Sequence, residues 1–326
     1  MPAKKTLPGE FQLIERLVQG LPISSRTILG PGDDCAILAP AKRPQLFTID
    51  SMIEDVHFRL AWTTPEKLGA KALSVNLSDI AAMGGTPTAC VVNLAIREGL
   101  ATRFFDRLYA GIRAVAERYE TDVVGGNVTS ADRLAITIAL LGEASRTVMR
   151  RDLARAGDGI FVTGTVGDSA AGLAILSGKL KASGAARKFL IERHVNPTPR
   201  IAAGLALAKL RPTAAAIDIS DGLLQDLGHI LKRSSVGAEI DVAAIPLSPA
   251  YRAAMGDDLN LALSGGEDYE LLFCARTRLS EEALTKALGV PVRRIGSIIA
   301  GSKILLRGVG ARMPMRRGWD QLRTGS

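Results

Sequence analysis

Cysteine, histidine and aromatic residues are all scarce in this sequence. Its 326 residues include three cysteines, three histidines and 4% aromatic residues. The cysteines, at positions 35, 90 and 274, are odd in number, far apart and without CxxC spacing. This pattern excludes a disulfide framework and a cysteine-based zinc site, and we expect a reducing, cytoplasmic environment.

Targeting segments and familiar catalytic motifs are missing as well. The opening MPAKKTLPGE has no apolar stretch, and no apolar run approaches 18 residues, so we expect neither a signal peptide nor a membrane span. GxGxxG, GxSxG and the protein-kinase HRD and DFG motifs are absent. Gly172 to Lys179 is not a P-loop, because Leu180 stands where serine or threonine is required. The histidines are too scattered to suggest a catalytic triad.

The basic residues are in excess but dispersed. Lysine and arginine number 41 against 33 acidic residues, a formal charge of +8, and the densest clusters are the two chain ends. A nucleic-acid binder usually concentrates its charge in a stripe, often with exposed aromatic residues. We therefore expect no nucleic-acid partner, whereas a small anionic substrate is compatible with this charge.

Length and patterning predict a two-domain α+β protein made of two α/β domains. The chain is long enough for two domains, and 47% hydrophobic residues can supply a core in each. A polar, arginine-rich stretch, Ala144–Arg155, places the boundary between domains 1–148 and 149–326. We expect strands at 45–50, 88–96, 134–142, 159–164, 214–218, 269–274 and 293–299, and helices at 65–83, 102–120, 168–178 and 222–234.

Aspartates recur beside glycines at the ends of apolar segments. They occur in GPGDD, FTID, NLSD and DISDG, which contain Asp34, Asp50, Asp79, Asp218 and Asp221. A buried carboxylate needs a cationic partner, and lysine and arginine are scarce in these segments. An all-oxygen ligand set suits Mg²⁺, so we expect several aspartates to hold it.

Each aspartate also has a purely structural interpretation. Asp79 falls in an apolar helical stripe but could cap a neighbouring element, Asp34 could belong to an ordinary turn, and Asp218 and Asp221 could cap the next helix. Three glycine-rich segments could form anion-binding turns, namely Gly125–Asn127, Gly164–Gly167 and Ser264–Asp268, although hairpins use the same residues.

A chain rich in carboxylates and poor in histidine suits phosphoryl transfer to a phosphate acceptor. The second pKa of a phosphate is about 6, so the acceptor is already ionised at pH 7 and needs no general base. The remaining obstacle is the repulsion between two anions, which metal ions relieve. We therefore expect metal-assisted positioning and no catalytic acid or base.

Six segments in order carry a resemblance to a known family. GEFQLIERL, GPGDDCAIL, KALSVNLSDIAAMGG, GTVGDSAAGLAIL, DISDGLLQDLGHI and LSGGEDYEL closely resemble the thiamine-monophosphate kinases, of the aminoimidazole ribonucleotide and selenophosphate synthetase superfamily, from Gly9 to about Asp320. The resemblance implies ATP-dependent phosphorylation of thiamine phosphate to thiamine diphosphate with several Mg²⁺ ions. It also implies a homodimer that pairs N-terminal sheets, and a C-terminal domain that closes the nucleotide site.

The resemblance also assigns roles by position. The family's metal-ligand positions correspond to Asp34, Thr48, Asp50, Asp79, Asn127, Asp218 and Asp221. The family's ATP-contacting positions correspond to Tyr109, Gly126, Asn127, Arg151 and Ser220. Its positions that contact thiamine phosphate correspond to His57, Glu267 and Trp319. An indole face attracts the cationic thiazolium ring. Ile49 and Asn127 depart from the family pattern: Ile49 can offer only its backbone carbonyl, and Asn127 an uncharged oxygen where many relatives have aspartate.

Alternative functions remain open at this point. A metal-dependent phosphohydrolase also uses clustered aspartates, another synthetase of the superfamily would act on a different substrate, and the +8 charge alone suggests a nucleic-acid binder. Separate glycine-rich segments, together with Glu267 and Trp319, favour an enzyme with two substrates.

Overall fold

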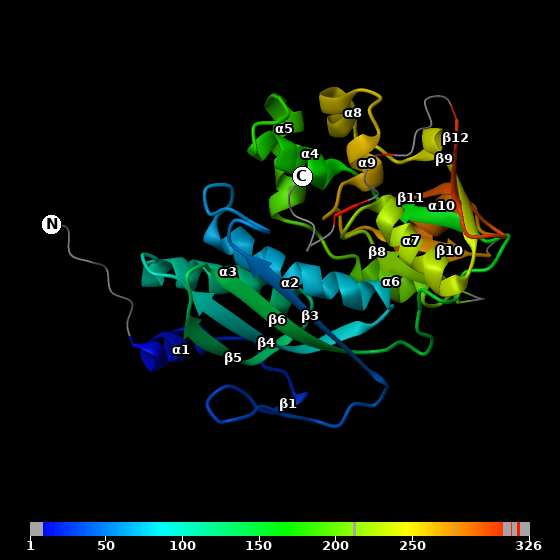
Figure 1. Cartoon of the computed structure of the whole chain (residues 1–326). Helices are drawn as coiled ribbons and strands as arrows, with labels where there is room; N and C mark the ends of the chain where they lie inside the picture. The colour runs from blue at the N-terminus through cyan, green and yellow to red at the C-terminus, as the bar shows by residue number, and fades with distance from the viewer. Residues whose placement is uncertain (1–8, 211–212, 277, 309–313, 315–317, 320–326) are drawn as a thin grey trace. The chain divides into compact units, whose positions relative to one another are not determined.

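The chain forms two compact units, each with one main sheet and packed helices (Figure 1). The computed structural model describes residues 9–210, 213–276, 278–308, 314, 318 and 319. Unit 1 is Met1–Ile80 with Thr86–Ala144, and unit 2 is Ala81–Gly85 with Ser145–Ser326. The predicted α+β class is confirmed.

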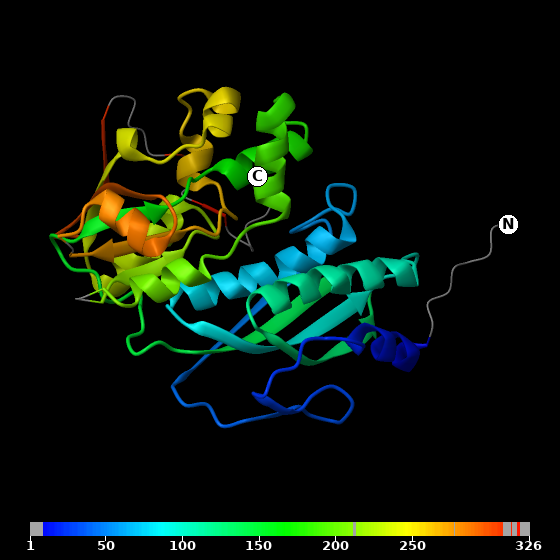
Figure 2. The same cartoon turned by 180° about the vertical axis from the view of Figure 1, so that it is seen from behind.

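Unit 1 is built on a four-stranded sheet in the order β3-β6-β4-β5. Its elements are α1 (Glu10–Val18), β1 (Thr27–Leu29), β2 (Ile37–Leu38), β3 (Gln45–Ile53), α2 (Pro65–Ala82), β4 (Thr86–Ile96), α3 (Thr102–Arg118), β5 (Asp122–Ser130) and β6 (Ala135–Glu143). Only the β4–β5 pair is parallel. Helices α2 and α3 lie over one face of the sheet, and β1 lies on the side of the other face (Figures 1 and 2).

Alternating side chains decide which face of this sheet the helices cover. In β6, Ile136, Ile138 and Leu140 are fully buried, while Thr137 and Ala139 between them are partly exposed. Successive side chains of a strand point to opposite faces, so the buried set defines the face under the helices. The other face stays open to solvent over much of its area.

Two glycines bring the backbones of α2 and α3 into direct contact. A Cβ atom on Gly69 would lie 2.0 Å from the carbonyl oxygen of Leu108, and one on Gly111 would lie 1.9 Å from that of Glu66. No side chain fits at such distances, so these glycines set the spacing of the two helices.

We expect Gly111→Ala to lower the free energy of unfolding by about 3 kcal/mol, because the added methyl group forces the two helices apart. Urea titration monitored by circular dichroism measures the change. Gly228→Ala is the matched control: a Cβ there meets nothing within 4 Å, so we expect stabilisation by up to about 1 kcal/mol. Equal stability of Gly111→Ala and the wild type would contradict the backbone contact.

Unit 2 contains a six-stranded sheet in the order β12-β9-β11-β7-β10-β8. Its elements are β7 (Gly159–Thr163), α4 (Asp168–Leu176), α5 (Gly184–Val195), α6 (Ile201–Leu207), β8 (Ala215–Asp218), α7 (Leu223–Ser234), β9 (Gly237–Asp241), the 3₁₀ helix η1 (Val242–Ala244), α8 (Pro249–Met255), α9 (Asn260–Ser264), β10 (Leu271–Ala275), α10 (Glu281–Leu288), β11 (Val292–Ile299) and β12 (Ile304–Arg307).

The strand directions in unit 2 gather three loops at one edge of the sheet. Strands β7 and β8 both run antiparallel to β10, which lies between them. The residues that follow β7 and β8 therefore share an edge with the residues that precede β10. On one face, Phe161 and Phe273 stack with ring centroids 5.1 Å apart. The opposite face packs against α4, α7 and α9 to form the main core of unit 2.

Among the helices of the described ranges, none combines the length and the apolar composition that a membrane span requires.

Candidate functional site

The loop after β8 and the segment before β10 are joined by main-chain hydrogen bonds at the shared edge. The N–H of Glu267 donates to the carbonyl oxygen of Ser220 at 2.8 Å, and the N–H of Tyr269 donates to that of Ile219 at 2.9 Å. DISDG (Asp218–Gly222) and SGGED (Ser264–Asp268) thus lie side by side. These are the segments that the resemblance assigns to metal, nucleotide and thiamine phosphate.

Glycine makes this close approach possible. A Cβ on Gly266 would lie 2.4 Å from the carbonyl oxygen of Ser220, and one on Gly222 would lie 2.8 Å from the main chain of Ser264. The glycines of both segments thus remove side-chain bulk where two backbones meet.

A third segment, GTVGD (Gly164–Asp168), meets the same edge. Its Gly167 N–H donates to the Asp268 carboxylate at 2.6 Å, and the Ser169 N–H donates to the same carboxylate at 3.1 Å. Burial raises the pKa of Asp268 to about 7, and these two donors act against that shift. Two of the three predicted glycine-rich segments therefore meet at this edge, and Ser264–Asp268 also lies beside the DISDG loop.

The conformation of the DISDG loop is held by the buried carboxylate of Asp226. One oxygen accepts the main-chain N–H groups of Ser220 at 3.1 Å, Asp221 at 3.1 Å and Gly222 at 3.0 Å. The N-cap residue of α7 is Gly222, with no side-chain cap, so the helix-capping interpretation of Asp218 and Asp221 is wrong. Asp218 itself is buried at the end of β8, with 3% of its surface exposed.

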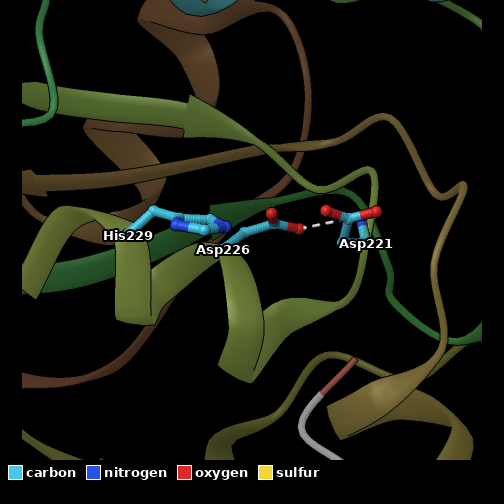
Figure 3. A group of neighbouring side chains, drawn as sticks. All are labelled: Asp221, Asp226 and His229. Atoms are coloured by element: carbon cyan, nitrogen blue, oxygen red, sulfur yellow. Dashed lines mark hydrogen bonds between the residues drawn. The ribbon is translucent and has the colours of Figure 1, made fainter. Parts of the chain in front are cut away.

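Asp221, Asp226 and His229 form a compact group that could hold a metal ion (Figure 3). One ligand atom from each lies within 4.8 Å of the others, and Asp226 lies between the other two. Burial raises the pKa of Asp226 to about 7, and the Asp221 charge adds to the shift. Burial also lowers the pKa of His229, with a further contribution from Arg151, so the exposed Arg151 lies near this group.

Trp319 is connected to the same loop by its main chain. Its N–H donates to the carbonyl oxygen of Asp221 at 2.9 Å, and its carbonyl oxygen accepts the amide of Gln225 at 2.5 Å. The indole remains 43% exposed. The neighbouring residues 320–326 lie outside the described part of the chain. Unit 2 thus brings together Asp218, Ser220, Asp221, Glu267 and Trp319.

Unit 1 brings together a second set of predicted ligands. The Thr48 hydroxyl donates a hydrogen bond to the carboxylate of Asp79. Asp50 lies two residues further along β3, about 7 Å away on the same face as Thr48. Helix α2 is buried on almost every side, so Asp79 occupies a largely buried helix rather than one apolar stripe.

Asp34 lies in the loop between β1 and β2, whereas β3 and α2 carry the group of Thr48, Asp50 and Asp79. It is exposed in the loop after β1, and its N–H donates to the Asp33 carboxylate at 2.8 Å. Strand β1 lies on the side of the sheet opposite α2 in both views (Figures 1 and 2). This hydrogen bond is typical of an ordinary turn. The role of Asp34 as a metal ligand stays a prediction.

The expected glycine-rich turn at Gly125–Asn127 is wrong, because these residues lie within β5. A Cβ on Gly126 would lie 2.1 Å from the carbonyl oxygen of Val92 on the adjacent strand. The Asn127 amide donates to Asn93 Oδ1 at 2.8 Å. Val92 and Asp50 both pair with Ile138, so they lie on the face that the helices cover. Asn93 follows Val92 and therefore lies on the open face, and its partner Asn127 lies on that open face too.

The remaining predicted contacts lie in different environments of unit 1. Tyr109 is buried in α3, where burial raises its pKa, which is the environment of a core residue. His57 accepts the Ile53 N–H at Nδ1 at 3.0 Å, so its proton lies on Nε2, where the ring can only donate. Ile49 is 62% exposed on the open face, in keeping with a backbone contribution only. The ligand contacts of Tyr109 and His57 stay predictions.

Comparison with known proteins identifies the family. The model of the AIR synthase related protein N-terminal domain matches residues 32–144, and that of the C-terminal domain matches residues 155–308. The thiamine-monophosphate kinase of Salmonella typhimurium is 42% identical over 305 residues, which are 90% of this chain and 91% of that protein. The chain belongs to the thiamine-monophosphate kinase family. The Bacillus subtilis thiamine-monophosphate kinase is 35% identical over 91% of this chain and 94% of its own length.

Solved structures of thiamine-monophosphate kinases share the fold. That of the Stenotrophomonas maltophilia K279a enzyme superposes with a TM-score of 0.80 and 36% identity, and covers 92% of this chain and 96% of its own. The structure described as AaThiL complexed with AMPPCP and TMP superposes with a TM-score of 0.75 and 34% identity, over 87% and 89% of the two chains. The similarity therefore extends over both units.

Asp226 and His229 are the residues that sequence reasoning missed. The signal was present as DGLLQDLGH, which places Asp226 four residues after Gly222 and His229 three residues later. That spacing puts both side chains on one face of α7, with Asp226 in the first turn and His229 about one turn later.

Proposed function

We propose that this protein transfers the γ-phosphoryl group of ATP to thiamine phosphate and so forms thiamine diphosphate. The observation that carries the proposal is the junction of the DISDG and SGGED segments with Trp319. Membership of the thiamine-monophosphate kinase family supports it, as does the similar structure that contains AMPPCP, an ATP analogue, together with TMP.

The donor sets of the two units both fit Mg²⁺. In unit 1, Asp50 and Asp79 offer only carboxylate oxygens and Thr48 adds a hydroxyl, and in unit 2 Asp218 and Asp221 offer only carboxylate oxygens. Hard oxygen ligands of this kind suit Mg²⁺ better than softer metals. Bound there, Mg²⁺ would neutralise charge on the phosphate oxygens of donor and acceptor.

The rest of the site positions substrates rather than moving protons. His57, with its proton on Nε2, suits donation to a phosphate oxygen. Glu267 offers a carboxylate to the amino group or positive charge of thiamine, and the exposed indole of Trp319 offers a face to the thiazolium cation. We assign ATP contacts to Tyr109, Gly126, Asn127, Arg151 and Ser220, and further metal contacts to Asp34 and Asn127, on the family pattern alone.

We assign metal binding, ATP binding and dimerisation to residues 1–148, and completion of the nucleotide and thiamine phosphate site to residues 149–326. The three free cysteines are compatible with a cytoplasmic location.

We further propose that the enzyme is a homodimer that pairs the open faces of two four-stranded sheets. Phe47, Ile49 and Val91 on that face are 71%, 62% and 41% exposed. Ile49 and Val91 both pair with Ala139 of β6, so they form a continuous row. An apolar patch of this kind on a solvent-facing sheet is typical of a protein interface.

Phe47→Glu should convert the dimer into a monomer, because it places a charge inside the paired faces. Light scattering after size-exclusion chromatography should give twice 34.5 kDa for the wild type and 34.5 kDa for the variant. Phe11→Glu is the control, since Phe11 is 82% exposed on α1, and α1 bonds through Arg16 to Asp106 of α3, which lies over the other face. A wild-type monomer, or an unchanged Phe47→Glu dimer, would refute this interface.

The activity is tested directly with purified protein, ATP, Mg²⁺ and thiamine phosphate. Chromatography should detect thiamine diphosphate and ADP in equal amounts, and chelation of Mg²⁺ should abolish both. Phosphate release without an acceptor would instead indicate a phosphohydrolase. ATP consumption with a different acceptor would indicate another synthetase of the superfamily.

A further inference from the structure

Glu267 adopts a backbone conformation that is unfavourable for a residue with a side chain. Its φ is +66°, and Tyr269 two residues later has a φ of +52°. The preceding glycines do not take this conformation: Gly265 has a φ of −79°, and Gly266 is not left-handed either. The strain therefore falls on the proposed substrate-binding residue, and only the surrounding structure can maintain it.

The main chain on both sides of Glu267 is fixed. Its own N–H donates to Ser220, and the Asp268 carboxylate accepts the N–H groups of Gly167 and Ser169 at the start of α4. Next to them, Glu270 is fully buried and accepts hydrogen bonds from Arg193 of α5 at 2.8 Å and from Arg200. These contacts leave the side-chain rotamer of Glu267 as the remaining degree of freedom.

A buried histidine contacts the Glu267 carboxylate. His194, at the end of α5, has 5% of its side chain exposed, and its Nδ1 lies 3.2 Å from Glu267 Oε2. The same Nδ1 lies 3.1 Å from the Ser169 hydroxyl. The Glu267 side chain is 25% exposed, so the imidazole faces it from the protein interior while part of the carboxylate reaches solvent.

We propose that His194 is a positioning residue that holds the Glu267 carboxylate toward thiamine phosphate. Its Nδ1 carries a proton and donates to Glu267 Oε2, and the Ser169 hydroxyl oxygen accepts from the same N–H. The His194 N–H thus fixes the rotamer of the Glu267 side chain, whose starting direction is set by the strained backbone. This inference rests on the proposed role of Glu267 in substrate binding.

Two substitutions at position 194 separate this role from simple packing. His194→Leu fills the space without a donor, whereas the Nδ2 of His194→Asn lies close to the original Nδ1 position. We expect His194→Leu to raise the KM for thiamine phosphate about tenfold, and the KM for ATP to stay within about twofold. We expect His194→Asn to restore the KM for thiamine phosphate to within about threefold of the wild type.

Leu190→Ala is the matched control, because Leu190 is fully buried one turn earlier on α5 and does not belong to this contact. It should lower the melting temperature without changing the KM for thiamine phosphate. If His194→Leu and Leu190→Ala change both KM values alike, or if His194→Asn fails to rescue, His194 only packs and the proposal is overturned.

A spectroscopic measurement tests the contact without turnover. In long-range ¹H–¹⁵N spectra of the full-length protein, we expect the His194 signals of an Nδ1-protonated ring, assigned by their loss in His194→Asn. Glu267→Gln should shift them. An unprotonated Nδ1, or no shift, would overturn the proposal even in an active enzyme. An inactive wild type with the expected signals would instead refute only the proposed function and leave the His194–Glu267 contact established.

Discussion

Replacing Asp50 by asparagine should lower kcat about a thousandfold while the protein remains folded. Asp50 lies on the same face of β3 as Thr48, whose hydroxyl bonds to Asp79, and its side chain is exposed on that face. Asparagine keeps the size and one oxygen of the side chain but removes the charge. A site whose task is to bring two anions together loses metal affinity and electrostatic stabilisation at once. Coupled ADP-release assays over a range of Mg²⁺ concentrations measure the loss.

Asp257→Asn supplies the matched control for that substitution. The Asp257 side chain is fully exposed and only 4.0 Å from Arg252 on the surface of unit 2. The same chemical change there should leave kcat within about twofold, since exposed ion pairs contribute little. If excess Mg²⁺ partly restores the Asp50→Asn enzyme, the loss is one of metal affinity. Unchanged turnover in this variant would remove Asp50 from the ligand set.

Helices and strands could be predicted from the sequence where the hydrophobic periodicity ends at residues that break a helix or a strand. The helix expected at 65–83 is α2 (Pro65–Ala82), and the strand expected at 45–50 is β3 (Gln45–Ile53). Strand β5 was missed because Gly125 and Gly126 resemble a turn in sequence. The partner strand explains Gly126, because the carbonyl oxygen of Val92 occupies the space that a side chain would need there. That contact is long-range and leaves no local signal.

The candidate site shows the same division between local and long-range information. Carboxylates at strand ends could be proposed from the sequence as metal ligands, because their chemistry is local, and that role stays a prediction. The contact of Thr48 with Asp79 depends on how α2 packs on the sheet, and that of Ser220 with Glu267 depends on strand order. Asp226 and His194 were missed for a further reason: the groups that they contact, the main chain of the DISDG loop and the Glu267 carboxylate, are brought to them only by the fold.

The loops of unit 2 share a construction in which main-chain groups, rather than side chains, carry most of the contacts. Glycines 222 and 266 allow the backbones to meet, and the N–H groups that result are satisfied by carbonyl oxygens or by buried carboxylates. Such an arrangement fixes where Ser220 and Asp221 lie mainly through their main chains, while Asp221 Oδ2 also accepts the Gln225 amide at 3.1 Å. The carboxylate of Asp226 is central to it.

We expect Asp226→Ala to lower kcat/KM at least a hundredfold. The main-chain N–H groups of Ser220, Asp221 and Gly222 would lose their common acceptor. Because Asp226 is only 1% exposed, bulk water has little access to replace its carboxylate. The loop would then relax, and a shift of about 1 Å in positioning groups costs about a hundredfold in rate. Asp226→Asn retains one acceptor oxygen in the same place and should lose only about tenfold.

Asp158→Ala distinguishes this positioning effect from general destabilisation. Asp158 is also buried in unit 2, and its carboxylate accepts the Arg155 N–H at 2.8 Å, but it precedes β7 at the opposite end of the sheet. Both alanine variants remove a buried carboxylate that accepts main-chain N–H groups, so both should lower the urea midpoint. Only Asp226→Ala should lower kcat/KM and weaken Mg²⁺ binding. Equal catalytic losses in the two variants would mean that Asp226 stabilises the unit without positioning Asp221, and the loop would then owe its conformation to the glycine contacts alone.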